Sequence, residues 1–146
     1  MIGTSPRLRL AGTLLVINLA IIWGNSLLPG EISGAISGFV RDLIAMLLPG
    51  DSAPGEGHGL LRKLAHFTEF ASLGMILTWI MLLVAKPIPL ALGCGFAAAC
   101  IDETIQVFVP DRGPAFTDVL IDTSGVLTGL FLLLLIRRWR KHHFTH

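Results

Sequence analysis

Titratable side chains interrupt otherwise apolar stretches of this chain, and their residue types could perform chemistry together. A histidine beside carboxylates can act as a general base whose tautomer is fixed by the acid. The same carboxylates and imidazole can hold a divalent cation, and lysine or arginine can bind a phosphate group. The residues concerned are Lys63, His66, Glu69, Asp102, Glu103, Gln106, Arg112, Asp118 and Asp122.

Two kinds of role follow from these residue types. We expect His66 and Glu69 to form an acid–base pair. Asp102, Glu103 and Asp122 would orient reacting groups or bind a cation, so all five are predicted catalytic residues. The predicted substrate-binding residues are Lys63, Gln106, Arg112 and Asp118. The alternative is a structural ion-pair network that locks three helices together. No close ligand spacing such as His-Glu-x-x-His is present, so the metal and any other cofactor stay open.

The composition indicates that these residues belong to a membrane protein. Hydrophobic residues make up 53% of the 146 residues and charged residues only 14%, whereas a soluble domain carries about a quarter charged residues. The length predicts a single membrane domain over residues 1–146. We expect no nucleic-acid partner, and the oligomeric state is left open.

Four apolar stretches are long enough to cross a bilayer as helices. They are residues 8–28, 60–84, 90–109 and 116–136. A cleaved signal peptide is the alternative for the first, but no small-x-small cleavage site follows its core. Residues 32–48 have apolar positions at helical spacing around one charged pair, which favours an interfacial amphipathic helix. The predicted fold is therefore an all-α integral membrane bundle of four transmembrane helices plus one amphipathic helix at the outer face, with a loop over residues 49–59.

The distribution of charge predicts the orientation of this bundle. With four spans, both termini lie on one side, and seven of the 11 basic residues fall on that side: Arg7, Arg9, Lys86, Arg137, Arg138, Arg140 and Lys141. Because cytoplasmic segments are enriched in lysine and arginine, both termini are expected in the cytoplasm. All 10 acidic residues then fall at or near the outer end of the bundle.

The polar residues of three predicted helices share one depth. His66 lies about 9 Å inside its helix, Asp102 about 10 Å before the end of the next, and Asp122 about 9 Å into the last. Asp122 also shares a helical face with Gly125 and Gly129, whose small size lets a neighbouring helix approach closely. Because carboxylates near lipid are costly, we expect the three helices to converge on one pocket open to the outer side.

Three motifs are specific enough to suggest a family. They are Asn25-Ser26-Leu27-Leu28-Pro29-Gly30 with Ser33 and Ser37; Lys63 with His66-Phe67 and Glu69-Phe70; and Asp102-Glu103, Gln106, Pro110, Arg112, Asp118, Asp122 and Gly125. Together they cover roughly residues 23–129, and the chain resembles the VanZ-like family of small membrane proteins. Two positions depart from the family pattern, because Asp111 stands where glycine is usual and Phe70 where tyrosine is common.

The resemblance implies a cell-envelope protein of the bacterial inner (plasma) membrane. The family's namesake is associated with resistance to teicoplanin, a lipoglycopeptide that acts on the outer face of the membrane. The expected partner is a membrane lipid or a lipid-linked envelope precursor, and the expected activity modifies or binds a phosphate- or glycan-bearing lipid. A non-catalytic scaffold or lipid-binding protein, in which the polar cluster is structural, is the alternative. A transporter is a third hypothesis, and it would need an oligomer because four helices are few for a pathway.

Overall fold

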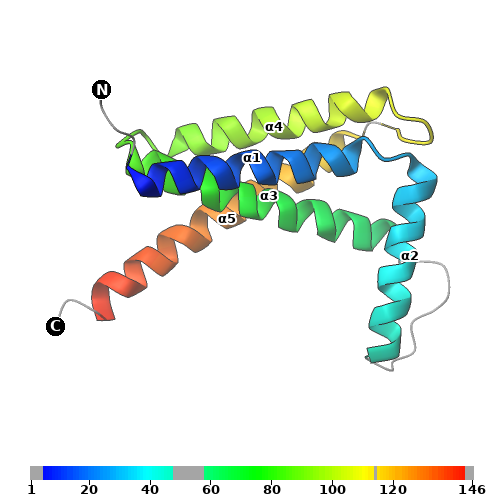
Figure 1. Ribbon diagram of the computed structural model, residues 1–146, viewed down its shortest axis with the longest axis horizontal. Coiled ribbons are helices and arrows are strands. Elements are labelled where there is room, and N and C mark those ends of the chain that lie inside the picture. Colours follow the sequence, from blue (N-terminus) through cyan, green and yellow to red (C-terminus); the bar gives the residue numbers. More distant parts are fainter. Residues whose placement is uncertain (1–4, 48–57, 114, 144–146) are drawn as a thin grey trace.

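The described part of the chain consists of helices joined by short turns. The computed structural model describes residues 5–47, 58–113 and 115–143, without the side chains of residues 37, 41–47, 58 and 59. Its helices are α1 (Pro6–Ser26), α2 (Gly30–Leu47), α3 (His58–Leu83), α4 (Pro89–Val107) and α5 (Phe116–His143) (Figure 1). Four of them are long and apolar enough to cross a membrane, over Pro6–Ser26, Leu60–Leu83, Pro89–Val107 and Phe116–His143. The predicted all-α membrane fold with four spans is confirmed.

The helix boundaries follow local sequence signals. Ser5 caps α1 by accepting a hydrogen bond from the backbone N–H of Leu8, and proline stands in the first turn of both α1 and α4, where its missing N–H is harmless. The last helix was expected to end at Ile136, but α5 continues to His143. The arginines and lysine after Ile136 are good helix formers and no glycine or proline stops them.

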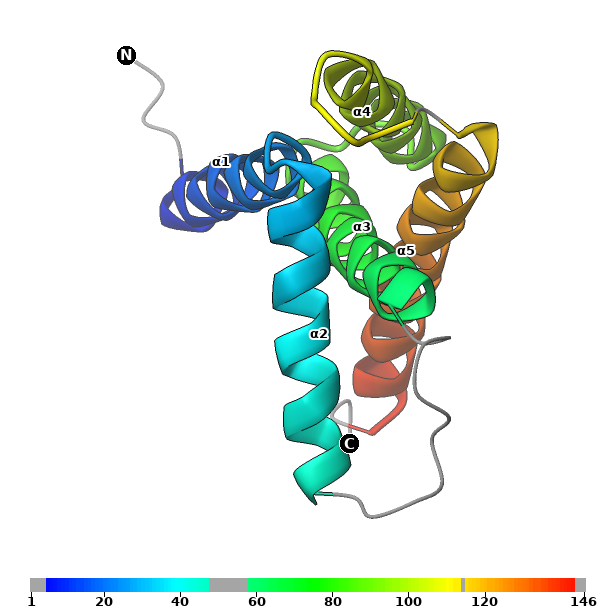
Figure 2. The ribbon, with the colours of Figure 1, turned by 90° about the vertical axis from the view of Figure 1, so that its right-hand side faces the viewer.

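The third helix is the centre of the bundle. It contacts α1, α2, α4 and, over the largest surface, α5, and the view along the bundle shows α1, α4 and α5 arranged around it (Figure 2). Glycines make the α3–α5 contact close. A Cβ atom on Gly125 or Gly129 would meet the backbone of Phe67 or Ala71 of α3, and one on Gly74 of α3 would meet the backbone of Val126. The predicted close approach at Gly125 and Gly129 is confirmed.

The second helix lies across one end of the bundle, while the start of α1 and the end of α5 lie at the other end (Figure 1). A helix was predicted over residues 32–48, and the described helix runs from Gly30 to Leu47. Ile32, Ile36 and Phe39 on α2 are exposed in the isolated chain, as an interfacial helix requires. The loop predicted over residues 49–59 falls outside the described residues, except that residues 58 and 59 already belong to α3.

The turn between α4 and α5 docks on the junction between α1 and α2. The backbone N–H of Gly30 donates to the carbonyl oxygen of Pro110 at 3.3 Å, and a Cβ atom on Gly30 would clash with the backbone of Asp111. Asp111 itself has a φ of 58°. The left-handed region accommodates aspartate better than most residues, so Asp111 fits this turn position.

Candidate functional site

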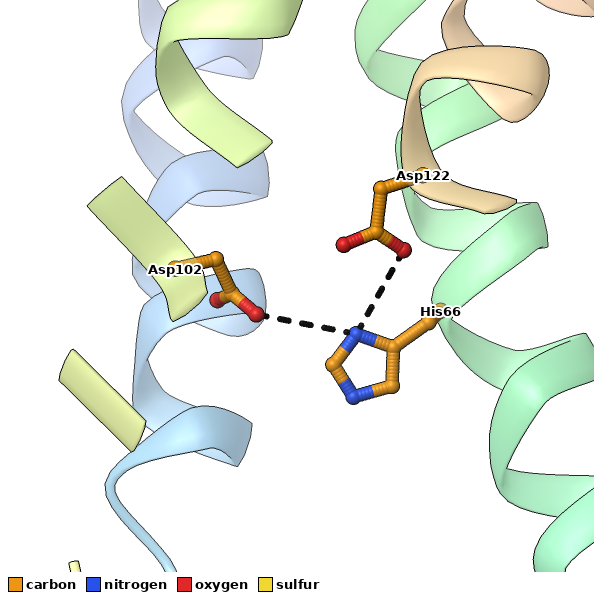
Figure 3. A group of neighbouring side chains, drawn as sticks. All are labelled: His66, Asp102 and Asp122. Carbon is orange, nitrogen blue, oxygen red and sulfur yellow. Dashed lines mark ion pairs between the residues drawn. The ribbon is translucent and has the colours of Figure 1, made fainter. Parts of the chain in front are cut away.

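Three helices bring one polar side chain each to the same point inside the bundle, at the end that α2 crosses (Figure 3). Nδ1 of His66 on α3 lies 3.7 Å from Oδ2 of Asp102 on α4 and 3.8 Å from Oδ1 of Asp122 on α5. The side chains of His66, Asp102 and Asp122 are 13%, 0% and 1% exposed. We call these three residues the polar centre. The predicted convergence of polar side chains from α3, α4 and α5 is confirmed, whereas their opening to the outer side stays a prediction.

Hydrogen bonds fix the orientation of Asp102. Ser26 at the end of α1 donates its hydroxyl to Oδ1 at 2.6 Å, and the Gln106 amide donates to Oδ2 at 2.9 Å. The Gln106 oxygen in turn accepts a bond from the Arg62 guanidinium at 2.7 Å. Asp102 therefore ends a chain of polar contacts that joins α1, α3 and α4, and its carboxylate cannot turn without breaking them.

Asp122 contrasts with Asp102, because it is buried without a hydrogen bond. Among the residues that the structure describes, neither carboxylate oxygen of Asp122 has a hydrogen-bond partner, and the same is true of Nδ1 of His66. A buried ionised group without a partner is destabilising by several kcal/mol in order of magnitude. Two buried carboxylates, one of them without a hydrogen bond, stand beside one imidazole and call for a positive charge between them, carried by a proton or by a metal ion.

The geometry of the polar centre is open to a metal ion. One ligand atom from each of His66, Asp102 and Asp122 can be chosen so that all three lie within 4.8 Å of one another. Imidazole and carboxylate oxygens are ligands that zinc and related divalent metals accept. These three residues are thus the ones that could hold a metal.

A cavity of about 100 Å³ adjoins the polar centre. We call it the Glu69 cavity; His66, Glu69, Arg62 and Arg112 contribute its titratable side chains. Oε1 of Glu69 accepts a bond from the side-chain amide of Asn25 at 2.5 Å, whereas Oε2 is buried without a partner in the described part of the chain. The volume has room for several water molecules or a group the size of a phosphate.

An apolar cavity of about 310 Å³ continues from the Glu69 cavity. It lies between α2 and α3, and both cavities are lined by Ile36 and Ala65. Its remaining lining comes from Val40, Leu61, Leu64 and Thr68. A polar cavity and an apolar groove therefore meet at the same two side chains.

Arg112 joins the α4–α5 turn to the end of α1. Its Nε donates to the Leu28 carbonyl oxygen at 3.2 Å and its Nη2 to that of Asn25 at 3.0 Å, at the C-terminal end of α1, where a cation is favourable. Burial lowers the pKa of the Arg112 guanidinium, and the neighbouring Arg62 lowers it further, but a guanidinium stays protonated at neutral pH. Its third nitrogen, Nη1, is buried without a described partner and is the group still able to bind an anion.

The other predicted residues lie around the centre rather than in it. Glu103 Oε2 accepts the backbone N–H of Ala115 at 2.9 Å, so Glu103 holds the α4–α5 turn. Lys63 and Asp118 line a small cavity of about 10 Å³ on the α5 side of His66 and Asp122, and Lys63 is exposed. Among the described contacts, neither Glu103 nor Lys63 bonds to the polar centre. Their predicted catalytic and binding roles stay predictions.

Three residues that build the site were not among the predicted site residues: Asn25, Ser26 and Arg62. Asn25 and Ser26 were quoted only as part of a family motif. Arg62 lies four positions before His66 and seven before Glu69, so helical spacing alone puts it on their face. Asn25 and Ser26 form a polar pair at the end of an apolar helix, a placement that usually has a function or a partner in membrane proteins. Both signals were available in the sequence.

Comparison with known proteins identifies one family. The family model described as VanZ/LLP1 matches residues 12–137, which include every residue of the polar centre and both cavities beside it. No curated protein and no solved structure matches the chain.

Proposed function

Because the chain belongs to the VanZ/LLP1 family of membrane proteins, we propose that it binds and modifies an anionic, phosphate- or glycan-bearing lipid of the bacterial cell envelope. The reaction would take place at the end of the bundle that α2 crosses, which faces outward when both termini are in the cytoplasm. An envelope role at the outer face also fits the family-level association with teicoplanin resistance.

The observation that carries this proposal is the meeting of two unlike cavities at Ile36 and Ala65. The Glu69 cavity offers two guanidinium groups, from Arg62 and Arg112, and guanidinium is well suited to phosphate and carboxylate groups. The apolar groove between α2 and α3 offers the surface that an acyl or isoprenoid chain needs. A lipid with an anionic headgroup is the molecule that fills both.

The same cavity holds the groups for proton transfer. His66 and Glu69 both line it, and the unpartnered Oε2 of Glu69 is an acceptor within the buried wall. A general acid or base must reach its substrate directly or through one water, and these two side chains satisfy that condition for a headgroup bound there. Asp102, held by Ser26 and Gln106, gives the centre a carboxyl group of fixed orientation.

The proposal is tested by comparing envelope lipids from cells that carry the wild type, Glu69→Gln or Glu31→Gln. Glu31 lies exposed on α2 outside the site, so Glu31→Gln is the matched control. We expect lipid mass spectrometry to show that Glu69→Gln abolishes a lipid change which the wild type and Glu31→Gln both produce. A lipid profile that is identical with and without the wild-type protein would refute the enzymatic proposal.

A steric variant tests the lipid separately from the acid. Ala65→Leu would fill the junction of the two cavities and would remove no charged or hydrogen-bonding side chain. We expect it to reduce the lipid change and the protection against teicoplanin together, while thermal unfolding in detergent stays close to that of the wild type. Full activity of Ala65→Leu would exclude this path for the lipid.

A structural scaffold is the second candidate. It is favoured by one observation, the chain of hydrogen bonds from Ser26 through Asp102 and Gln106 to Arg62, which ties helices together. In a scaffold, Glu69→Gln would lower the unfolding temperature in step with the loss of phenotype. In an enzyme, this nearly isosteric change abolishes the phenotype and leaves unfolding nearly unchanged.

A further inference from the structure

The polar centre brings one possible ligand atom from each of its three residues close enough for a single ion to bind them all. Both oxygens of Asp122 and Nδ1 of His66 lack partners in the described chain, and the Asp122 side chain is 1% exposed. We propose that His66, Asp102 and Asp122 bind a divalent transition metal of the zinc type. A structural ion-pair lock would not leave a fully buried carboxylate unbonded, because its desolvation would then be uncompensated.

The ligand types and their surroundings fit such an ion. Imidazole and carboxylate groups are both zinc ligands, and a site with three protein ligands leaves a further position for water or substrate. Ligands are usually oriented by hydrogen bonds from neighbouring groups. Ser26 and Gln106 orient Asp102 in this way, and Arg62 orients Gln106.

The three ligand atoms lie within 4.8 Å of one another, so the side chains have to move inward to bind one ion. A tetrahedral zinc ion at about 2.0–2.2 Å from each ligand keeps its ligands roughly 3.3–3.6 Å apart. Nδ1 of His66 is 3.7 Å from Asp102 and 3.8 Å from Asp122. Asp122 has no hydrogen bond to break when it turns towards the ion. Asp102 and His66 would thus receive the ion, and Asp122 would close on it.

Metal binding would also give His66 and Glu69 different roles. This step alone rests on the proposed function. With Nδ1 on the metal, His66 becomes a ligand. Glu69, whose Oε2 is unpartnered in the wall of the same cavity, remains as the general base for a metal-bound water or a substrate hydroxyl.

The test measures metal content, which does not depend on knowing the lipid. Exposed His142 and His143 and the terminal His146 could bind zinc adventitiously, so the parent protein carries all three as glutamine and is purified without a histidine tag. We expect about one zinc per chain after expression with zinc. We expect that content to fall at least tenfold in His66→Gln and in Asp122→Asn, and to be unchanged in Asp111→Asn, an exposed control.

Replacing zinc with Co²⁺ adds a second readout, because the visible spectrum of Co²⁺ reports its ligand set. We expect a tetrahedral spectrum in the parent and its loss in Asp122→Asn at the same protein concentration. Equal metal content in the parent and both variants, or an octahedral aqueous spectrum in the parent, would overturn the metal proposal. Metal that binds normally beside an unchanged lipid profile would refute the proposed function and leave the metal site standing.

A second inference comes from the opposite end of the bundle. There α5 diverges from α3 towards its C-terminal end (Figure 1), and a cavity of about 640 Å³ lies between α1, α3 and α5. Its cationic lining is Arg7, Arg137, Arg140 and Lys141, and its apolar lining includes Trp79 and Leu133. Among the described residues, its lining contains no acidic side chain. We infer that an anionic phospholipid occupies this cavity, with its phosphate among the cations and its chains on the apolar wall.

This site can be tested with charge-matched variants. Arg137→Gln with Arg140→Gln removes two cations that line the cavity, and Arg9→Gln with Arg138→Gln removes two that do not. In detergent with added phosphatidylglycerol, we expect the unfolding temperature of the wild type and of the second pair to rise, and that of the first pair to rise much less. Phosphatidylcholine should have little effect on any of them.

Two outcomes would overturn this inference. An equal loss of the lipid effect in both pairs would mean that total charge, and not the cavity, attracts the lipid. Dimerisation of the wild type without any lipid effect, abolished by Arg137→Gln with Arg140→Gln, would assign the cavity to a second copy of the chain.

Discussion

The two ends of the bundle carry opposite charges in opposite surroundings. At the end that α2 crosses, Asp102 and Asp122 are almost completely buried, and Asp102 is oriented by specific neighbours. At the other end, Arg137, Arg138 and Arg140 are exposed on the last turns of α5. The stability of a buried charge depends on its individual partners, whereas a single exposed charge contributes little and matters mainly as part of the total charge. The first end should therefore be sensitive to single substitutions and the second largely tolerant of them.

The largest expected effect concerns which end faces the cytoplasm. If basic residues set the orientation, a reporter fused at Lys86 or after His146 should read cytoplasmic and one inserted at Gly57 should read external. The readout is all or none, because a reporter domain lies on one side or the other. An external signal after His146 would place the polar centre at the cytoplasmic end and remove the outer-leaflet lipid from consideration.

The next largest effect is expected for Asp102→Ala. The change leaves the Ser26 hydroxyl and the Gln106 amide without their acceptor in a buried place, so the free energy of unfolding should fall by about 3–5 kcal/mol. Denaturant unfolding in detergent, followed by circular dichroism, measures this. Glu31→Ala on exposed α2 should change it by less than about 1 kcal/mol. Equal effects of the two substitutions would contradict the contrast between buried and exposed charge.

A smaller effect is expected at the crossing that separates the two ends. A Cβ atom on Gly129 would clash with the Ala71 backbone, so Gly129→Ala should lower the free energy of unfolding by about 2–3 kcal/mol. Gly12 on α1 has no atom within 4 Å of such a Cβ. Gly12→Ala should therefore be neutral or stabilising by up to about 1 kcal/mol. The same unfolding experiment compares them, and a neutral Gly129→Ala would mean that α3 and α5 are less close than described.

Arg112 shows how a cation at the buried end differs from one at the exposed end. Arg112→Gln removes bonds to the carbonyl oxygens of Asn25 and Leu28, and we expect a loss of about 1–2 kcal/mol in the free energy of unfolding. Arg112→Lys should lose nearly as much, because an ammonium group cannot reproduce the two-point geometry. Full rescue by lysine would show that only the charge matters there.

The smallest effect is expected for Arg138→Gln, at the exposed end outside the cavity between α1, α3 and α5. A surface substitution without a specific partner changes the free energy of unfolding by less than about 0.5 kcal/mol. Thermal unfolding in detergent should not distinguish Arg138→Gln from the wild type. A loss as large as that of Arg112→Gln would show that the two ends do not differ as proposed.

The sequence by itself determined the membrane class, the four spans and the depth of the site. A long apolar run is stable in a bilayer as a helix, which satisfies its own backbone hydrogen bonds. The number and position of the helices therefore follow from composition and length. Polar residues inside those runs have to face each other, which is why His66, Asp102 and Asp122 could be expected to meet. The family was also recognisable from short motifs, and its model matches residues 12–137.

Only the tertiary structure decided which polar groups bond to which. Periodicity shows which residues share a face of a helix, but not how that helix is rotated relative to its neighbours. A shift of about one side-chain length decides whether a residue lies in the site or contacts the structure beside it. For this reason Glu103, expected beside Asp102, turned out to hold the Ala115 backbone, and Arg62, not selected, proved to hold Gln106. The unbonded state of Asp122 and the meeting of two cavities at Ala65 are likewise products of packing between helices distant in sequence.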